Sequence, residues 1–360
     1  MAKKLAFDRS LFTVVIVLVG FGLTMVYSAS VMVGGAGGSG TSLIIKQTLA
    51  ALIGLVAMWL AMHTDYRLLQ RRVVVWSLVG AAAGLLALAL LSPELNGTRR
   101  WLFVGGFSFQ PSELAKLATV VFFAYQMAKY EESGRVSRYL MPAVVVGGVM
   151  ALLVLLGRDL GSAVMLLTMA GLLLLLAGMP YLPMIAASLA VGPMLAAAVL
   201  FEPYRRQRLL AFLEPEKDPL GAGFQAIQSL IALGSGGWLG LGLGRSVQKL
   251  HFLPYPHSDF VFSIVGEELG YIGALVVVAL FGVLLWRGLV AGFRAPDPFG
   301  KYLAWGLSAA LTIQAFVHIS VAASLLPATG ITLPFVSYGG SSLVVTLVAS
   351  GLLLNVSQHG

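Results

Sequence analysis

Residues 11–33 read LFTVVIVLVGFGLTMVYSASVMV, a run without a charged side chain. A helix needs about 20 apolar residues to cross the hydrocarbon core of a bilayer, and this run is long enough. Lys3, Lys4 and Arg9 stand before it, so the run has some features of a signal peptide. Its length, and the similar runs that follow it, predict instead a first membrane helix that stays in the protein.

The composition of the whole chain supports a membrane protein. Of the 360 residues, 58% are hydrophobic and only 11% are charged, and the mean hydropathy is +0.91. A soluble domain is about 45–50% apolar and about 25% charged, which excludes a water-soluble globule. The net charge of +8 is spread through apolar sequence, which argues against disorder and against a nucleic-acid partner. The chain has no cysteine, so disulfides and thiolate chemistry are excluded.

Similar apolar runs recur along the chain, separated by polar or glycine-rich breaks. They predict an all-α polytopic membrane protein with about ten transmembrane helices, in one integral membrane domain over residues 1–360. The predicted spans are residues 11–33, 43–62, 73–91, 112–130, 140–156, 161–178, 181–200, 260–286, 302–325 and 335–355.

Basic residues in the short loops predict the orientation, because cytoplasmic loops carry an excess of Lys and Arg. If the N-terminus is cytoplasmic, the inner segments hold Lys3, Lys4, Arg9, Arg67, Arg71, Arg72, Lys129, Arg135, Arg138, Arg287, Arg294 and Lys301. The short outer loops then hold only Lys46, Arg99, Arg100 and Arg158. Both termini are therefore predicted to be cytoplasmic, with one long extracytoplasmic loop, residues 202–259, between the seventh and eighth helices.

The long outer loop is rich in cations, at Arg205, Arg206, Arg208, Lys217, Arg245 and Lys249. One interpretation is that the loop is polar because water solvates it. The other is that cations on the outer face bind a phosphate-bearing ligand, for which Arg and Lys are suited. Residues 226–233 are amphipathic and predict a short helix in the interface plane. The glycines of residues 234–244 follow no predicted strand, so they indicate tight turns and close backbone approach, not a nucleotide site.

Asp259 stands where this loop re-enters the membrane. Partial desolvation makes a carboxylate there a useful base, while nearby cations favour its ionised form. The alternative is that Ser258 or Asp259 caps the next helix. Glu267 and Glu268 follow one to two turns after the start of the next apolar span at Phe260–Phe262, where acids are costly.

Other polar positions lie near the ends of predicted spans. Glu113 and Lys116 are three residues apart and share a helix face, either as a structural ion pair or as direct contacts to a ligand. Residues 326–342 break a helix at membrane depth, which predicts a polar cavity beside them. His318 is expected to be a hydrogen-bonded interior residue. No zinc site is expected, because the histidines lack acidic neighbours at ligand spacing.

Together these motifs resemble one family, the SEDS proteins of bacterial envelope growth, which are FtsW, RodA and SpoVE. The matching strings occur in the family's order over nearly the whole chain, at residues 96–101, 109–116, 158–161, 218–228, 240–250, 253–270 and 326–342. Several strings look more like FtsW or SpoVE than RodA. Two positions depart from the family pattern, since Tyr255 replaces a common acid and Arg158 adds a cation on the outer face.

The resemblance implies a peptidoglycan glycosyltransferase that polymerises lipid II, the undecaprenyl-pyrophosphate-linked disaccharide pentapeptide. Such a multi-pass protein would work among membrane lipids at the outer face of the bacterial cytoplasmic membrane, in cell division if FtsW-like or in elongation if RodA-like. The expected partners are a class B penicillin-binding protein, which cross-links the strands, and other divisome or elongasome proteins.

In the mechanism that we expect, Asp259 is the catalytic base and activates the acceptor GlcNAc 4-hydroxyl for an inverting displacement. The leaving pyrophosphate needs no proton donor if cations neutralise its charge. The substrate-binding residues are expected to be Lys249, Arg205, Arg206, Arg208, Arg99, His257 and Ser258. The structural or positioning residues are expected to be Glu113, Lys116, Glu267, Glu268, Ser337, Gly339 and Gly340. No residues are assigned to a metal, although a divalent cation, Mg²⁺ or Mn²⁺, would be able to share the role of the basic side chains.

Two other functions remain as alternatives. A transporter that flips lipid II usually has ionisable groups near the bilayer midplane and paired repeats with broken helices. Here the acids and bases cluster at the outer edge and no repeat is visible, which favours the enzyme. A non-catalytic scaffold for the penicillin-binding protein would not need the Arg-rich loop.

Overall fold

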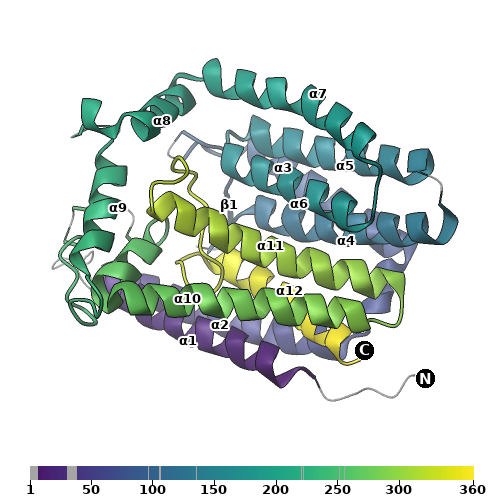
Figure 1. Cartoon of the computed structure of the whole chain (residues 1–360), viewed down its shortest axis with the longest axis horizontal. Helices are drawn as coiled ribbons and strands as arrows, with labels where there is room; N and C mark the ends of the chain where they lie inside the picture. Colours follow the sequence, from purple (N-terminus) through teal and green to yellow (C-terminus); the bar gives the residue numbers. More distant parts are fainter. Residues whose placement is uncertain are drawn as a thin grey trace.

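The computed structural model describes residues 7–30, 39–95, 97–104, 107–134, 136–219, 221, 223–250, 252–254 and 256–360. Four residues named in the sequence analysis lie outside the described residues, namely Lys3, Lys4, Arg135 and Tyr255. The fold is a bundle of long helices with the shorter helices α8 and α9 at one end, as Figure 1 shows.

Ten helices fall on the ten predicted spans. They are α1 (Arg9–Ser30), α2 (Ser39–His63), α3 (Arg72–Leu90), α4 (Pro111–Ser133), α5 (Val136–Leu156), α6 (Leu160–Leu176), α7 (Tyr181–Leu200), α10 (Val261–Arg294), α11 (Pro298–Ala322) and α12 (Gly340–Ser357). The outer loop contains α8 (Pro203–Leu213), η2 (Pro215–Lys217) and α9 (Phe224–Ser235), and α9 includes the amphipathic residues 226–233. The remaining elements are η1 (Tyr66–Gln70) and an antiparallel hairpin of β1 (Leu102–Val104) and β2 (Phe107–Phe109).

Among the described residues, eight helices are long and apolar enough to cross a membrane, namely α1, α2, α3, α5, α7, α10, α11 and α12. Helix α4 is more polar, and α6 has only 17 residues. The prediction of a polytopic helical membrane protein is therefore confirmed. The count of about ten spans and the cytoplasmic side of the termini stay predictions.

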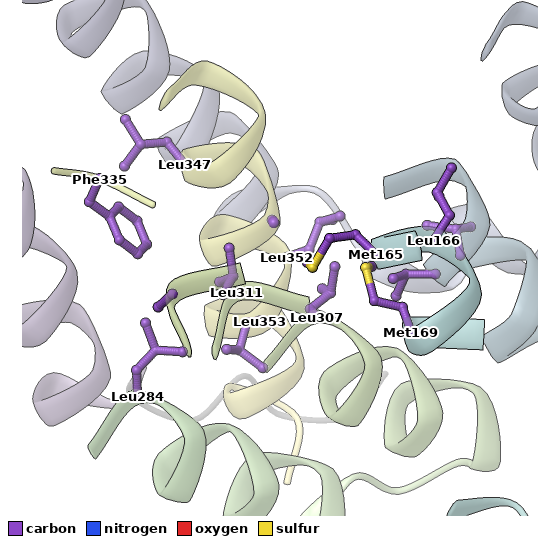
Figure 2. Close-up of a cluster of buried hydrophobic side chains, with 14 of the residues drawn as sticks. Met165, Leu166, Met169, Leu284, Leu307, Leu311, Phe335, Leu347, Leu352 and Leu353 are labelled. Carbon is purple, nitrogen blue, oxygen red and sulfur yellow. The ribbon is translucent and has the colours of Figure 1, made fainter. Parts of the chain in front are cut away.

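Helices α4, α11 and α12 form the centre of the bundle, and most of their side chains are buried. Helix α12 packs against α2, while α11 packs against α4 and α10. Figure 2 shows part of this core, where Met165 and Met169 of α6 lie near Leu307 of α11 and Leu352 of α12. Helix α7 lies along the edge of the bundle in Figure 1 and buries none of its apolar window, as a helix surrounded by lipid would.

The two ends of the chain meet at one end of the bundle. Asp8 caps α1 by accepting a hydrogen bond from the Leu11 N–H at 3.1 Å, and it pairs with Arg287 of α10. The Asp8 N–H donates to Ser357 Oγ at 3.3 Å, at the end of α12. The start of α1 and the end of α12 thus lie at the same end of the bundle, as a chain with both termini on the same side of a membrane requires.

Helix α10 is interrupted at Gly270, whose φ of 69° and ψ of −169° are not helical. The glycine-rich segment of the outer loop fills this break, and the Leu241 N–H donates to Glu267 O at 3.0 Å. The backbones approach closely because no side chain intervenes, and a β-carbon on Gly240 would lie only 2.2 Å from Glu268 O. The role predicted for these glycines is confirmed, and the broken helix keeps its backbone groups hydrogen-bonded.

Candidate active site

Asp259 lies two residues before the start of α10 and is half-buried. Its Oδ2 atom is 3.7 Å from the point where a β-carbon on Gly330 would stand, and Arg100 Nη2 is 3.5 Å from the same point. Three segments that are far apart in sequence therefore meet here, from the loop before β1, the end of the outer loop and the loop before α12. The N-cap of α10 is Phe260, so the alternative interpretation of Ser258 or Asp259 as the helix cap is not supported.

The backbone beside Asp259 is held by the segment that precedes α12. Ser337 Oγ donates to Ser258 O at 2.6 Å, and the Tyr338 N–H donates to His257 O at 2.8 Å. Gln47 of α2 fixes this segment in turn, because its Nε2 donates to Ser337 O at 3.2 Å. This geometry agrees with the positioning role expected of Ser337.

Gly339 and Gly340 join the start of α12 to α2. The Gly339 N–H donates to Gln47 Oε1 at 3.1 Å. A β-carbon on Gly340 would lie 3.3 Å from the β-carbon of Ala50, so a side chain there would push the two helices apart. Both contacts fit the structural role expected of these glycines.

Two histidines interact electrostatically with Asp259. The His257 ring stands edge-on to the ring of Tyr338, with centroids 5.5 Å apart. Burial lowers the pKa of His257 from its usual 6.5, and the Asp259 carboxylate opposes this only in part, so His257 is neutral at pH 7. His318 of α11 is 1% exposed, and its Nδ1 is hydrogen-bonded to Ile331 O at 2.8 Å. His318 is thus the hydrogen-bonded interior residue that was expected.

Arg100 and Asp159 complete the polar groups at this site. Arg100 Nη1 lies 3.5 Å from Asp159 Oδ2, and Arg100 Nε has no hydrogen-bond partner among the described residues. Neither residue is among those predicted from the sequence, which include the neighbouring Arg99. The Arg99 side chain is 53% exposed and faces Glu94. Adjacent side chains in an extended segment point to opposite sides, and only the fold decides which side faces the site.

The three arginines of α8 lie in different surroundings. Arg208 Nη1 donates to Ala328 O at 3.0 Å, in the loop after α11. Arg205 Nη1 donates to Ala198 O of α7 at 3.0 Å, while Arg206 is exposed. Of the three, Arg208 is the one that lines the cavity next to Asp259.

This cavity has a volume of about 280 Å³ and is bounded by α8, α9, the end of α11 and the loop after it. Its lining includes Arg208, Phe212, Phe224, Gln225, Phe260 and Leu326. Phe260 follows Asp259 directly in the sequence, and Ala328 of the lining is two residues from Gly330, so the cavity lies near the segments that carry the site. Walls that are mainly apolar, with a guanidinium among them, suit a ligand that has both apolar and anionic parts.

Lys249 and the two glutamates of α10 form a separate buried cluster. Lys249 Nζ lies 2.8 Å from Glu268 Oε1, and Ser28 Oγ of α1 donates to the same oxygen at 2.7 Å. Glu267 Oε2 accepts a hydrogen bond from Ser246 Oγ at 2.5 Å. The cluster fastens the outer loop to α10 and α1, in agreement with the positioning role expected of Glu267 and Glu268. The pyrophosphate contact of Lys249 stays a prediction.

Glu113 and Lys116 also form a buried cluster. Lys116 Nζ donates to Glu113 Oε1 at 2.9 Å and to Gln314 Oε1 of α11 at 2.5 Å. Gln314 Nε2 then donates to Thr332 O at 2.9 Å, in the loop before α12. The ion pair that was one of the two interpretations is present. Through Gln314 it connects α4 and α11 to the loop before α12, whose Ser337 and Tyr338 hold the backbone beside Asp259.

Within the described part of the chain, no group of three or more His, Asp or Glu side chains is arranged to hold a metal ion. At the site itself, Asp259 has the Arg100 guanidinium close by, and a positive charge there disfavours a second cation. These side chains do not make a metal centre on their own. The divalent cation therefore stays a prediction.

Comparison with known proteins gives full-length matches. The family model of the FtsW/RodA/SpoVE proteins, described as "Cell cycle protein", matches residues 8–360. The probable peptidoglycan glycosyltransferase FtsW of Geobacter sp. (strain M18) is 39% identical over 100% of this chain and 99% of its own. Stage V sporulation protein E of Bacillus subtilis (strain 168) is 40% identical over 99% of this chain and 98% of its own. A solved structure described as "Structural coordination of polymerization and crosslinking by a peptidoglycan synthase complex" is similar with a TM-score of 0.79 and 34% identity, covering 98% of each chain.

Proposed function

This chain belongs to the FtsW/RodA/SpoVE family of cell cycle proteins and is a peptidoglycan glycosyltransferase, and we propose that it polymerises lipid II with Asp259 as the catalytic base. The observation that carries the proposal is the meeting of Asp259 and Arg100 beside Gly330, next to a largely apolar cavity. A base, a cation for phosphate and an apolar surface for part of the lipid-linked substrate are elements that this transfer needs.

In the proposed step, the 4-hydroxyl of the acceptor GlcNAc gives its proton to Asp259 while its oxygen attacks the anomeric carbon of the donor sugar. The new glycosidic bond forms opposite the leaving group, so the configuration at that carbon inverts. The bond from this carbon to the pyrophosphate breaks, and the undecaprenyl pyrophosphate leaves with the bonding electron pair. One base is sufficient, because the pyrophosphate departs as a stabilised anion without taking up a proton.

The leaving pyrophosphate is stabilised by Arg100 in this proposal, with Arg208 as a second cation in the cavity. The planar fork of a guanidinium matches the geometry of phosphate oxygens, and Arg100 Nε is buried without a hydrogen-bond partner among the described residues. Both side chains are already oriented, Arg100 by Asp159 and Arg208 by Ala328 O. Groups that are oriented before the reaction stabilise developing charge without a further reorganisation cost.

We propose that the reaction takes place at the outer face of the bacterial cytoplasmic membrane. The excess of Lys and Arg in the predicted cytoplasmic loops supports this, because it puts the loop that carries Asp259 on the outer side. The similar solved structure is of a complex that coordinates polymerization and crosslinking, which supports a cross-linking partner such as a class B penicillin-binding protein. Since curated relatives are named FtsW, we propose a role in cell division, together with other divisome proteins, in preference to elongation.

Purified protein and labelled lipid II in detergent test the function. The protein is incubated alone and with its transpeptidase partner, whose own activity is blocked, and the products are separated by glycan length. We expect glycan strands in at least one of the two reactions. Detergent micelles have no compartments, so a flippase would leave lipid II monomeric, and so would a scaffold. Monomeric lipid II under both conditions would contradict the proposed function.

A further inference from the structure

Asp159 carries a buried charge that its helix does not need. It is 2% exposed and is the N-cap of α6, where its Oδ1 accepts a hydrogen bond from the Ser162 N–H at 3.1 Å. Asn caps a helix about as well as Asp does. Because a buried carboxylate is costly unless it is paired, the charge of Asp159 calls for an explanation beyond capping.

The partner of this charge is Arg100. Asp159 Oδ2 lies 3.5 Å from Arg100 Nη1 and accepts hydrogen bonds from Ser162 Oγ at 2.9 Å and Gln110 Nε2 at 3.3 Å. Gln110 is itself fixed, because its N–H donates to Ser341 Oγ of α12 at 3.2 Å. The carboxylate is therefore held by α6, by the start of α4 and, through Gln110, by α12.

The Arg100 guanidinium also lies near Asp259, beside the Gly330 β-carbon position. Arg100 Nη2 and Asp259 Oδ2 lie 3.5 Å and 3.7 Å from the β-carbon position of Gly330. Opposite charges that share one partly buried site attract one another. Without the charge of Asp159, the guanidinium would be drawn to Asp259. Direct pairing would make the carboxylate a weaker base and would occupy the donors that the pyrophosphate needs.

We propose that Asp159 is a positioning residue that holds Arg100 away from Asp259 and oriented toward the pyrophosphate of the substrate, an inference that rests on the proposed function. Asp159 contacts no substrate and acts only through Arg100. It affects two measurable properties, the affinity for the lipid pyrophosphate and the basicity of Asp259.

The substitution Asp159→Asn tests this, because it keeps the side-chain volume and the cap but removes the charge. In the full-length protein we expect the KM for lipid II to rise about tenfold, the usual size for loss of one charge-assisted contact. The acid limb of the kcat/KM pH profile is expected to move to lower pH, because a cation that pairs with the base favours its ionised form. Binding of undecaprenyl pyrophosphate, measured directly and without turnover, is expected to weaken by the same factor.

A double-variant cycle separates positioning from simple structural damage. In the presence of Arg100→Gln, the change Asp159→Asn is expected to add almost nothing to the loss, because Asp159 acts through Arg100. Asp65→Asn is the matched control, since Asp65 also caps a short helix through the Arg67 N–H but lies at the other end of the bundle. It is expected to leave KM and the pH profile unchanged.

Unchanged KM, pH profile and pyrophosphate binding in Asp159→Asn would overturn the inference, and so would additive losses in the double variant. If Asp159→Asn fails to fold, Asp159→Glu moves the charge by one methylene, and unchanged pyrophosphate binding in that variant would overturn it equally. A wild-type protein that makes no polymer contradicts the proposed function, whereas the binding measurement still decides the inference, so the two failures are distinguishable.

Discussion

Lys249 and Glu268 form an ion pair with an Nζ–Oε1 distance of 2.8 Å, and the two residues are 3% and 0% exposed. Ser28 of α1 joins the pair, because Lys249 Nζ donates to Ser28 Oγ at 3.1 Å and Ser28 Oγ donates to Glu268. The outer loop, α10 and α1 are thus connected at one point, close to the break in α10. This cluster fixes the path of the loop before it returns to Asp259.

Replacing one member of this pair is expected to destabilise the protein strongly. Lys249→Met leaves the Glu268 carboxylate buried without its cation, which costs about 3–5 kcal/mol. A lower Tm of the detergent-purified protein measures this, and adding Glu268→Gln is expected to recover most of the loss. Lys217→Met is the control, because its exposed pair with Glu214 contributes at most about 1 kcal/mol. Equal Tm values for Lys249→Met and wild type would show that the pair is not a structural element.

The membrane helices can be predicted from the sequence because each of them corresponds to an apolar run of the right length. The contacts of Lys249 cannot be predicted in this way, since nothing in the sequence of a polar loop indicates that a broken helix buries one of its lysines. The break at Gly270 is equally hidden, because it depends on the approach of Gly240 and Leu241 from the outer loop. Tertiary contacts decide these features, and periodicity does not record them.

Arg100 and Arg99 provide a matched test of the site. Arg100→Gln removes the guanidinium beside Asp259 and is expected to lower kcat/KM for lipid II by about tenfold to a hundredfold, as for the loss of a charge-assisted contact. Arg99→Gln removes an exposed charge that faces Glu94 and is expected to change kcat/KM by less than about twofold. Initial rates over a range of lipid II concentrations give both values. The reverse order of the two losses would restore Arg99 as the ligand contact.

Arg99 and Arg100 also show which part of the site cannot be predicted from the sequence. Asp259 was found because a carboxylate at a membrane boundary is unusual on its own. Arg99 and Arg100 are adjacent and chemically identical, and only the path of the chain into β1 directs Arg100 toward Asp159. Asp159 itself resembles an ordinary helix cap until its second oxygen is placed next to the guanidinium.

Gly330→Ala tests the space between Asp259 and Arg100. The added methyl group would stand within 4 Å of both side chains, where we expect substrate atoms, and Gly330 has a φ of +70° that disfavours alanine. We expect the polymerisation rate to fall by at least about tenfold, since a small displacement of reacting groups is costly. Gly134→Ala has a similar φ of +66° with open space around it, so it is expected to lose stability but not activity. Equal rates in the two variants would mean that the space beside Gly330 is not used.

His257 is expected to make the stability depend on pH. Burial holds its pKa below 6.5 in the folded protein, so between the folded and unfolded values the unfolded chain binds more protons. The stability contribution of neutral His257 is therefore present above about pH 6.5 and is lost as the pH falls through the folded pKa. Tm is measured from about pH 7.5 to about pH 5.5 for wild type and His257→Gln. Wild type is expected to lose more Tm over this range, and parallel curves would contradict this account.

The most direct measurement of the central claim is polymerisation of lipid II by purified Asp259→Asn. Asn has the same shape, and Asp259 is not the cap of α10, so the variant is expected to fold with a Tm close to that of wild type. It is also expected to bind lipid II. Its rate is expected to fall by about a hundredfold to ten-thousandfold, the usual contribution of a general base. Glu216→Gln also replaces a carboxylate by an amide in the outer loop, but outside the site, and is expected to keep the wild-type rate. Polymer made by Asp259→Asn at the wild-type rate would contradict the assignment of Asp259 as the base.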